Sequence, residues 1–129
     1  MTTAPSVMKL HLYYRLFIAE MNSDINILRI FDDYTKEIVT KNSDPEIRKG
    51  VDYFKLNFIR FRKEIDYLRD EMHVKKMKLL VLTKERKLLD TKTFKTDNHN
   101  EILKQYKTYK KNFDKLKKEF IRYVGKNLH

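Results

Sequence analysis

The chain has 129 residues and a formal net charge of +11, and this length suits a single domain spanning residues 1–129. Its two glycines and two prolines are too few for the turns of a compact β fold, and the absence of cysteine excludes disulfides and thiolate metal sites. There is neither an apolar run of roughly 18 residues for a membrane span nor a signal-peptide pattern. We therefore expect an all-α, cytoplasmic protein without a membrane partner.

The first predicted helix spans about residues 6–41. Apolar residues recur at alternating spacings of three and four, which is typical of a helix packed on its neighbours. We call such a row the seam of the helix. Asn22-Ser23-Asp24 are poor helix formers that cap well, so a kink there is the alternative. The seam consists of Val7, Leu10, Tyr14, Phe17, Met21, Asp24, Leu28, Phe31, Thr35 and Ile38.

The second predicted helix spans residues 45–90, and its seam stays in register over about six heptads. Ser43-Asp44-Pro45-Glu46 provides a capping side chain, a first-turn proline and a glutamate placed for a capping box. Lys75 and Arg86 are polar residues on the seam. Its apolar members are Ile47, Val51, Phe54, Phe58, Phe61, Ile65, Leu68, Met72, Leu79, Leu82 and Leu89.

The third predicted helix spans residues 98–125, from a cap pair of Asn98 and Glu101 to Gly125. Short linkers at 42–44 and 91–97 favour antiparallel neighbours. We therefore predict three long antiparallel helices in an up-down-up, coiled-coil-like bundle. The third seam consists of Ile102, Tyr106, Tyr109, Phe113, Leu116, Phe120 and Tyr123.

The predicted helices differ in length, which suggests an incomplete bundle. Folding at the two linkers places residue 10 beside residue 113, so that the third helix ends near the level of residue 24. Residues 25–38 then pair only with residues 47–61 and leave apolar side chains uncovered, a surface suited to a homodimer. The alternatives are that the third helix reaches further or that the first helix bends. The predicted oligomer interface consists of Ile27, Ile30, Tyr34, Tyr53, Leu56 and Ile59.

Polar residues on or near the seams are the candidates for chemistry. Asp24 falls near Arg60 and Arg62 in this alignment, and control of helix register explains it better than catalysis. Asp66, Asp70 and His73 share a helix face, but no second helix supplies matching ligands. We therefore predict no metal site and a solvated charge cluster of Asp70 and Arg69 beside His73. With no phosphate-binding loop and no catalytic constellation, we predict no enzyme, no cofactor and no small-molecule substrate.

Basic residues concentrate in the last segment. Residues 91–129 hold eleven Lys and Arg against four Asp and Glu, whereas residues 1–41 hold five of each. Lysines recur every seven residues on the outer face of the third helix, and such a stripe can follow a phosphate backbone. The alternative is a solvated face that keeps the protein soluble. The predicted polyanion-binding residues are Lys104, Lys107, Lys111, Lys115, Lys118 and Arg122.

Two functions follow from these patterns. The first is a non-enzymatic structural or adaptor protein that acts through helix-face contacts with a protein partner, most simply a second copy of itself. The second is an accessory nucleic-acid-binding protein that uses the basic face of the third helix. The first depends on the uncovered apolar residues, and the second depends on the lysine stripe.

Overall fold

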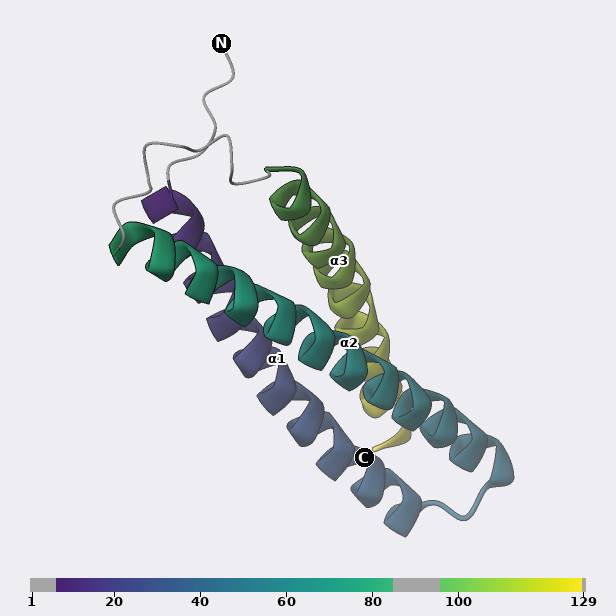
Figure 1. Cartoon of the computed structure of the whole chain (residues 1–129). Coiled ribbons are helices and arrows are strands. Elements are labelled where there is room, and N and C mark those ends of the chain that lie inside the picture. Colours follow the sequence, from purple (N-terminus) through teal and green to yellow (C-terminus); the bar gives the residue numbers. More distant parts are fainter. Residues whose placement is uncertain (1–6, 85–95, 129) are drawn as a thin grey trace.

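The computed structural model describes residues 7–84 and 96–128, and the regular elements in these ranges are helices. Helix α1 spans Val7–Lys41, α2 spans Pro45–Lys84 and α3 spans Thr96–Asn127. Neighbouring helices run in opposite directions, with α1 and α3 descending and α2 ascending in the view of Figure 1. The predicted all-α three-helix bundle is confirmed. The predicted end of the second helix at residue 90 lies outside the described residues.

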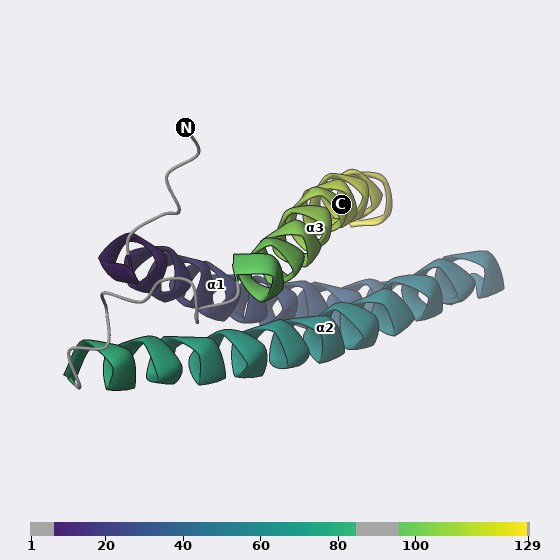
Figure 2. The same cartoon turned by 45° about the horizontal axis from the view of Figure 1, so that its top comes forward.

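Helices α1 and α2 form an antiparallel pair, and α3 lies across one face of this pair (Figure 2). The connection between α1 and α2 is short, and both helix ends are capped locally. Asn42 Nδ2 donates to the carbonyl of Ile38 at 2.9 Å, and the Glu46 N–H donates to Asp44 Oδ1 at 2.9 Å. Asp44 is therefore the N-cap of α2, and Pro45 occupies the first turn, where it costs no hydrogen bond.

Helix α1 is continuous through Asn22-Ser23-Asp24, so the alternative of a kink is wrong. Met21 and Ile25 are buried on either side of these residues. The side chain of Asp24 is directed to partners on α3 and does not compete for its own backbone. Tertiary contacts thus override the weak local helix propensity.

The centre of the core is a cluster of aromatic rings in which Phe120 of α3 meets both other helices. Its ring centroid lies 4.6 Å from that of Phe31 on α1. It lies 5.1 Å and 5.2 Å from the centroids of Phe54 and Phe58 on α2. Offset and edge-on ring pairs at such distances are favourable beyond the apolar area they bury. All four rings occupy predicted seam positions, so the seams are confirmed here.

The position of α3 along the pair differs from the predicted one. Tyr109, and not a residue near the end of α3, lies beside Asp24. Further along, Asn42 Nδ2, just after the end of α1, donates to the Asn127 carbonyl at 3.1 Å. Helix α3 therefore covers the pair as far as the α1–α2 connection, and the predicted two-helix end is wrong. The alternative of a longer reach holds, and at this offset the ring of Phe120 packs on Phe31 of α1 and on Phe54 and Phe58 of α2.

None of the helices in the described ranges contains a stretch apolar enough to cross a lipid bilayer.

Candidate functional site

Asp24 is a buried carboxylate between α1 and α3, with only 3% of its surface exposed. Its Oδ2 accepts a hydrogen bond from the Tyr109 hydroxyl at 2.5 Å and lies 3.0 Å from Lys110 Nζ. The predicted pairing of Asp24 with Arg60 or Arg62 is wrong, because the observed offset of α3 brings its own polar side chains to Asp24. A buried carboxylate held by a cation and a phenol is stable only in one arrangement of the two helices.

Two further polar contacts join the same helices. Tyr106 donates its hydroxyl proton to Glu20, and the hydroxyl of Tyr14 bonds Nδ1 of the buried His99. Desolvation, followed by the nearby charge of Lys75, lowers the pKa of His99 to about 4, so the ring is neutral at physiological pH and the direction of its hydrogen bond with Tyr14 depends on the tautomer. Desolvation also raises the pKa values of the three phenols.

We call these three contacts the polar ladder. Its α3 residues sit 85 or 86 positions after their α1 partners, so each contact requires the same offset between the helices. The ladder is compatible with the predicted role of Asp24 in control of helix register, which stays a prediction. The sequence places Asp24, Tyr106 and Tyr109 on seams, but periodicity alone does not show that they meet. No pattern in the sequence indicated that His99 would be buried or would contact Tyr14.

His73 is exposed on α2, and the predicted cluster around it is arranged differently. Arg69 contacts Asp66, with Nη2 3.2 Å from Oδ1, and donates Nη1–H to Asn22 Oδ1 at 3.0 Å. Arg62 Nε lies 3.1 Å from the same Asp66 oxygen. Across the described parts of the chain, no three His, Asp or Glu side chains converge as metal ligands.

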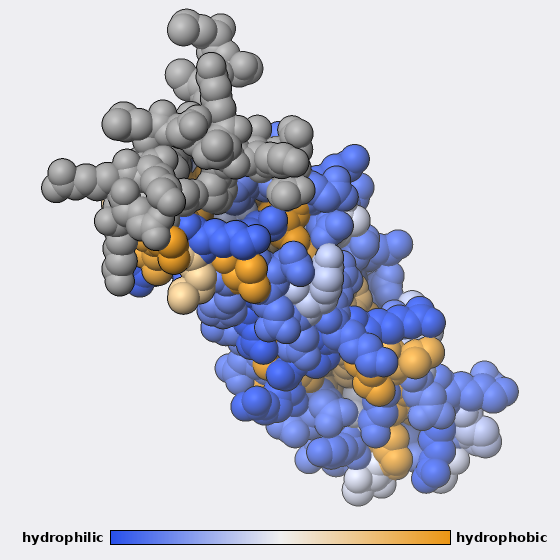
Figure 3. All heavy atoms as spheres, in the orientation of Figure 1, coloured by the Kyte–Doolittle hydropathy of each residue, from blue (hydrophilic) through white to orange (hydrophobic). Residues whose placement is uncertain are grey.

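The predicted oligomer-interface residues occupy several outer faces. Ile27 is partly buried against the core, whereas the other five side chains are 44–55% exposed. Ile30 and Tyr34 form an adjacent i, i+4 pair on α1. On α2, Tyr53 and Ile59 lie about 120° apart around the helix axis, so they belong to different flanks with Leu56 between them. Apolar side chains form separate patches within a hydrophilic surface on the face shown in Figure 3.

All six predicted polyanion-binding residues of α3 are exposed. None of them forms an ion pair with another residue in the described ranges. The two lysines of α3 that do form ion pairs are turned partly inward: Lys110 meets Asp24, and Lys117 Nζ lies 3.2 Å from Asp114 Oδ1. We call the six outward residues the α3 basic face: Lys104, Lys107, Lys111, Lys115, Lys118 and Arg122. Their positive charge therefore faces solvent without internal neutralisation.

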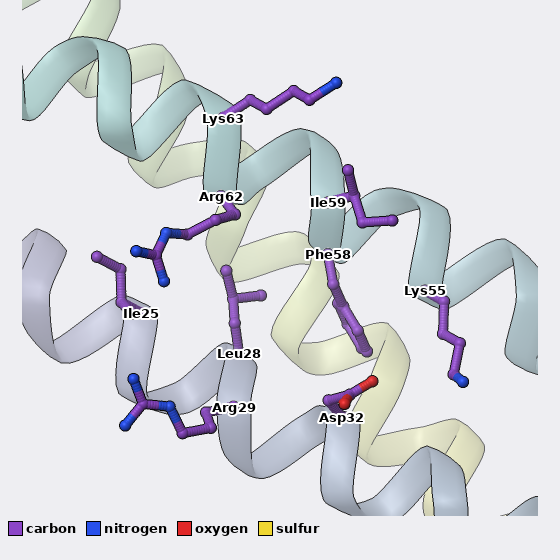
Figure 4. Close-up of a pocket in the computed structure, with 9 residues that line it drawn as sticks. All are labelled: Ile25, Leu28, Arg29, Asp32, Lys55, Phe58, Ile59, Arg62 and Lys63. Carbon is purple, nitrogen blue, oxygen red and sulfur yellow. The ribbon is translucent and has the colours of Figure 1, made fainter.

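An open groove of about 550 Å³ lies between α1 and α2, and α3 passes behind it (Figure 4). Phe58 belongs to its floor, because this buried side chain also packs on Phe120 of α3. Four cations and a single acid surround the apolar centre of the groove. The periodicity of the sequence could not reveal this groove, because its lining comes from two helices. The lining residues are Ile25, Leu28, Arg29 and Asp32 of α1 and Lys55, Phe58, Ile59, Arg62 and Lys63 of α2.

Internal ion pairs neutralise only part of the charge around the groove. Asp32 Oδ2 lies 3.5 Å from Lys36 Nζ, and Arg62 is held by Asp66. Arg29, Lys55 and Lys63 form no ion pair with any residue of the described segments. In Figure 4 the guanidinium group of Arg62 extends from α2 into the space between the two helices, whereas that of Arg29 lies along α1. The groove therefore combines apolar contact with uncompensated positive charge, which suits an anionic, amphipathic ligand.

No family model, no curated protein and no solved structure matches this chain.

Proposed function

We propose that this chain is a non-enzymatic structural or adaptor protein that acts through contacts of its helix faces and associates with a second copy of itself. The supporting observation is the exposure of large apolar side chains on a bundle whose core is already closed. Ile30, Tyr34, Tyr53, Leu56 and Ile59 are each 44–55% exposed. Fully burying one such aliphatic side chain is worth about 1.5–3 kcal/mol, so a partner surface gains by covering them.

The row of Ile30 and Tyr34 is the simplest surface for self-association. The two residues are one helical turn apart on α1 and lie on its outer side. A two-fold axis beside this row sets the same two side chains of both copies against each other, as isologous contacts require. The interface then contains an aliphatic and an aromatic side chain from each copy, and their flanks stay in water.

Analytical ultracentrifugation across micromolar concentrations tests the proposal. We expect the wild type to form a dimer and the double variant Ile30→Ser/Tyr34→Ser to be monomeric. The matched control is Tyr67→Ser/Ile121→Ser, which removes two comparably exposed apolar side chains outside the predicted interface and should leave the dimer intact. A wild type that stays monomeric, or a dimer insensitive to the first variant, refutes self-association through this row.

Polyanion binding by the α3 basic face is a second candidate function, favoured by the separation of inward, paired lysines from outward, unpaired ones. Residues 104–122 span about 27 Å of helix at 1.5 Å per residue, so the face can follow several phosphates. The seam tyrosines and phenylalanines of α3 are buried or half-buried and provide no exposed platform for stacking bases. Binding on this face is therefore expected to be electrostatic and independent of sequence.

Titration with duplex and single-stranded nucleic acid at two salt concentrations tests this candidate. We expect affinity to fall steeply with salt, and Lys104→Glu/Lys111→Glu/Lys118→Glu to abolish binding. The control Lys36→Glu/Lys41→Glu/Lys49→Glu makes the same change in net charge at exposed lysines that form ion pairs on α1 and α2. Equal losses in both triple variants would show that only overall charge matters.

A further inference from the structure

The α1–α2 pair has two faces, and the fold shows what one of them binds. Helix α3 covers one face and inserts Phe120 between α1 and α2. The groove lies on the opposite face, where the same two helices diverge around Ile25, Leu28 and Phe58. A further helix is thus the natural shape for the groove, since it would extend three helices to a four-helix arrangement.

The dimensions of the groove fit a helical segment of a few turns. Its lining covers residues 25–32 on α1 and 55–63 on α2, which is about two turns on each helix. One turn beyond the lining, Arg69 donates a hydrogen bond to Asn22 across the two helices and closes that end. Ile59 is 55% exposed in the wall, so it is available to side chains spaced at i, i+3 and i+7 on an occupant.

The charge of the groove selects among possible helices. Arg29, Lys55 and Lys63 lie at the rim without an ion pair to the rest of the described chain. A basic helix is therefore repelled, and a carboxylate on the flank of an occupant finds a cation on either helix. The same reasoning disfavours the α3 basic face of a second copy as the occupant, because its six exposed cations would face the cations of the rim.

We propose that the groove binds an acidic amphipathic helix of a different protein chain. Its apolar side chains would rest on Leu28, Phe58 and Ile59, and its acidic flanks would meet Arg29 on α1 and Lys55 and Lys63 on α2. This inference rests on the proposed adaptor function and specifies the chemistry of the partner. It makes the protein a link between its own second copy and an acidic helical segment.

A labelled peptide provides the test. The probe is a helical peptide of about 18 residues, or roughly five turns, with leucines at i, i+3, i+4 and i+7 and glutamates on both flanks. Fluorescence anisotropy measures its binding to the full chain at low and physiological ionic strength. The control peptide keeps the leucines and carries lysine at every glutamate position. We expect the acidic peptide to bind and the basic peptide to show no binding.

Matched charge reversals locate the site. Arg29→Glu/Lys55→Glu/Lys63→Glu should weaken binding at least about tenfold, because three rim charges become repulsive. Lys41→Glu/Lys49→Glu/Lys78→Glu makes the same change in net charge at exposed lysines outside both the groove and the α3 basic face and should weaken it by less than about threefold, since only long-range attraction is lost. Equal weakening by both triple variants overturns the proposal. The glutamine versions of the groove changes give a milder variant if the glutamate version does not fold.

Methyl NMR and competition complete the test. Adding the peptide should shift the methyl signals of Ile25, Leu28 and Ile59 and leave Ile121 on α3 unchanged; the reverse pattern overturns the proposal. Vesicles containing phosphatidylserine serve as the competing occupant. If the vesicles displace the peptide and their binding depends on the same rim cations, the occupant of the groove is a lipid surface and the helix proposal is overturned. If self-association disappears in the groove variant, the occupant of the groove is a second copy of the chain and the proposal is likewise overturned.

The failure of this inference can be distinguished from the failure of the adaptor proposal. Ile30→Ser/Tyr34→Ser removes the predicted dimer contact and leaves the groove lining unchanged. If this variant is monomeric and binds the peptide as the wild type does, both proposals stand. A dimeric wild type without peptide binding overturns only the groove, whereas a monomeric wild type that binds the peptide overturns only self-association.

Discussion

Removal of the Asp24 side chain is the most direct test of how α3 is held on α1. In Asp24→Ala, the Tyr109 hydroxyl loses an acceptor at 2.5 Å and Lys110 Nζ loses a carboxylate oxygen at 3.0 Å. Tyr109 is fully buried, so its hydroxyl cannot turn to water in place. Lys110 is 26% exposed at its side chain and can partly rehydrate. The variant therefore leaves one donor stranded and one only partly solvated.

The expected cost follows from these two environments. Breaking a buried ion pair by removing one partner costs about 3–5 kcal/mol. Because Lys110 reaches water, we expect the lower end, a loss of about 3 kcal/mol in the free energy of unfolding. Asp24→Asn keeps an oxygen acceptor for Tyr109 and loses only the charge, so its cost should be about 1–2 kcal/mol. The control Asp33→Ala removes an exposed carboxylate of α1 and should stay within about 0.5 kcal/mol.

Urea unfolding followed by circular dichroism measures these differences. A double-mutant cycle with Tyr109→Phe isolates the contact, and we expect a coupling of about 1 kcal/mol between Asp24 and the phenol. If Asp24→Ala costs no more than Asp33→Ala, or if the cycle shows no coupling, then the buried carboxylate does not fix the position of α3. The interpretation of the polar ladder as a register device would then be wrong.

Three further predictions concern the core. The pKa of His99 is about 4 in the folded state and 6.5 for an ordinary histidine, so the unfolded chain takes up the proton first as the pH falls. The free energy of unfolding should therefore drop by about 2 kcal/mol between pH 7 and pH 5. Urea unfolding of the wild type and His99→Gln at both pH values shows whether the variant lacks this drop. Gly50→Ala should destabilise the wild type, because the new Cβ falls 2.6 Å from the Tyr123 hydroxyl. In a Tyr123→Ala background the same substitution should stabilise the protein by about 1 kcal/mol through helix propensity. A change in the free energy of unfolding with the same sign in both backgrounds contradicts the clash. Phe120→Ala should cost about 3–5 kcal/mol by leaving a cavity among three rings, and thermal unfolding checks it against Ile121→Ala, which should be near neutral.

The seams were predictable because burial follows a local repeat. Tyr14, Phe58, Phe113 and Phe120 are buried where a helix of 3.6 residues per turn directs them inward. The same repeat does not determine the offset of one helix along the axis of its neighbour, since a seam residue packs almost as well when its helix is moved by one turn. The offset of α3 is instead set by specific pairs, such as Tyr123, whose hydroxyl donates to the Ile47 carbonyl at 2.7 Å and whose ring lies over Gly50.

The same distinction applies to the candidate sites. The α3 basic face lies on one helix, so the seven-residue spacing of Lys104, Lys111 and Lys118 predicted its outward direction. The groove combines α1 and α2, and that Arg29 and Lys63 line the same groove follows only once the relative position of the two helices is known. His99 illustrates the third case, because a neutral buried histidine is defined by its contact with Tyr14 and not by any pattern around it.

The polar ladder also bears on how the two basic surfaces can act together. It holds α3 against one face of the α1–α2 pair at a single offset, and this turns the α3 basic face away from the groove on the other side. A ligand bound to one surface therefore cannot contact the other surface. Reversing the charge of one surface affects binding at the other only through screened, long-range electrostatic interactions. If both surfaces bind acidic partners, the bundle separates them by its own thickness. The adaptor function that we propose would use this separation, because two acidic partners held on one face would repel each other.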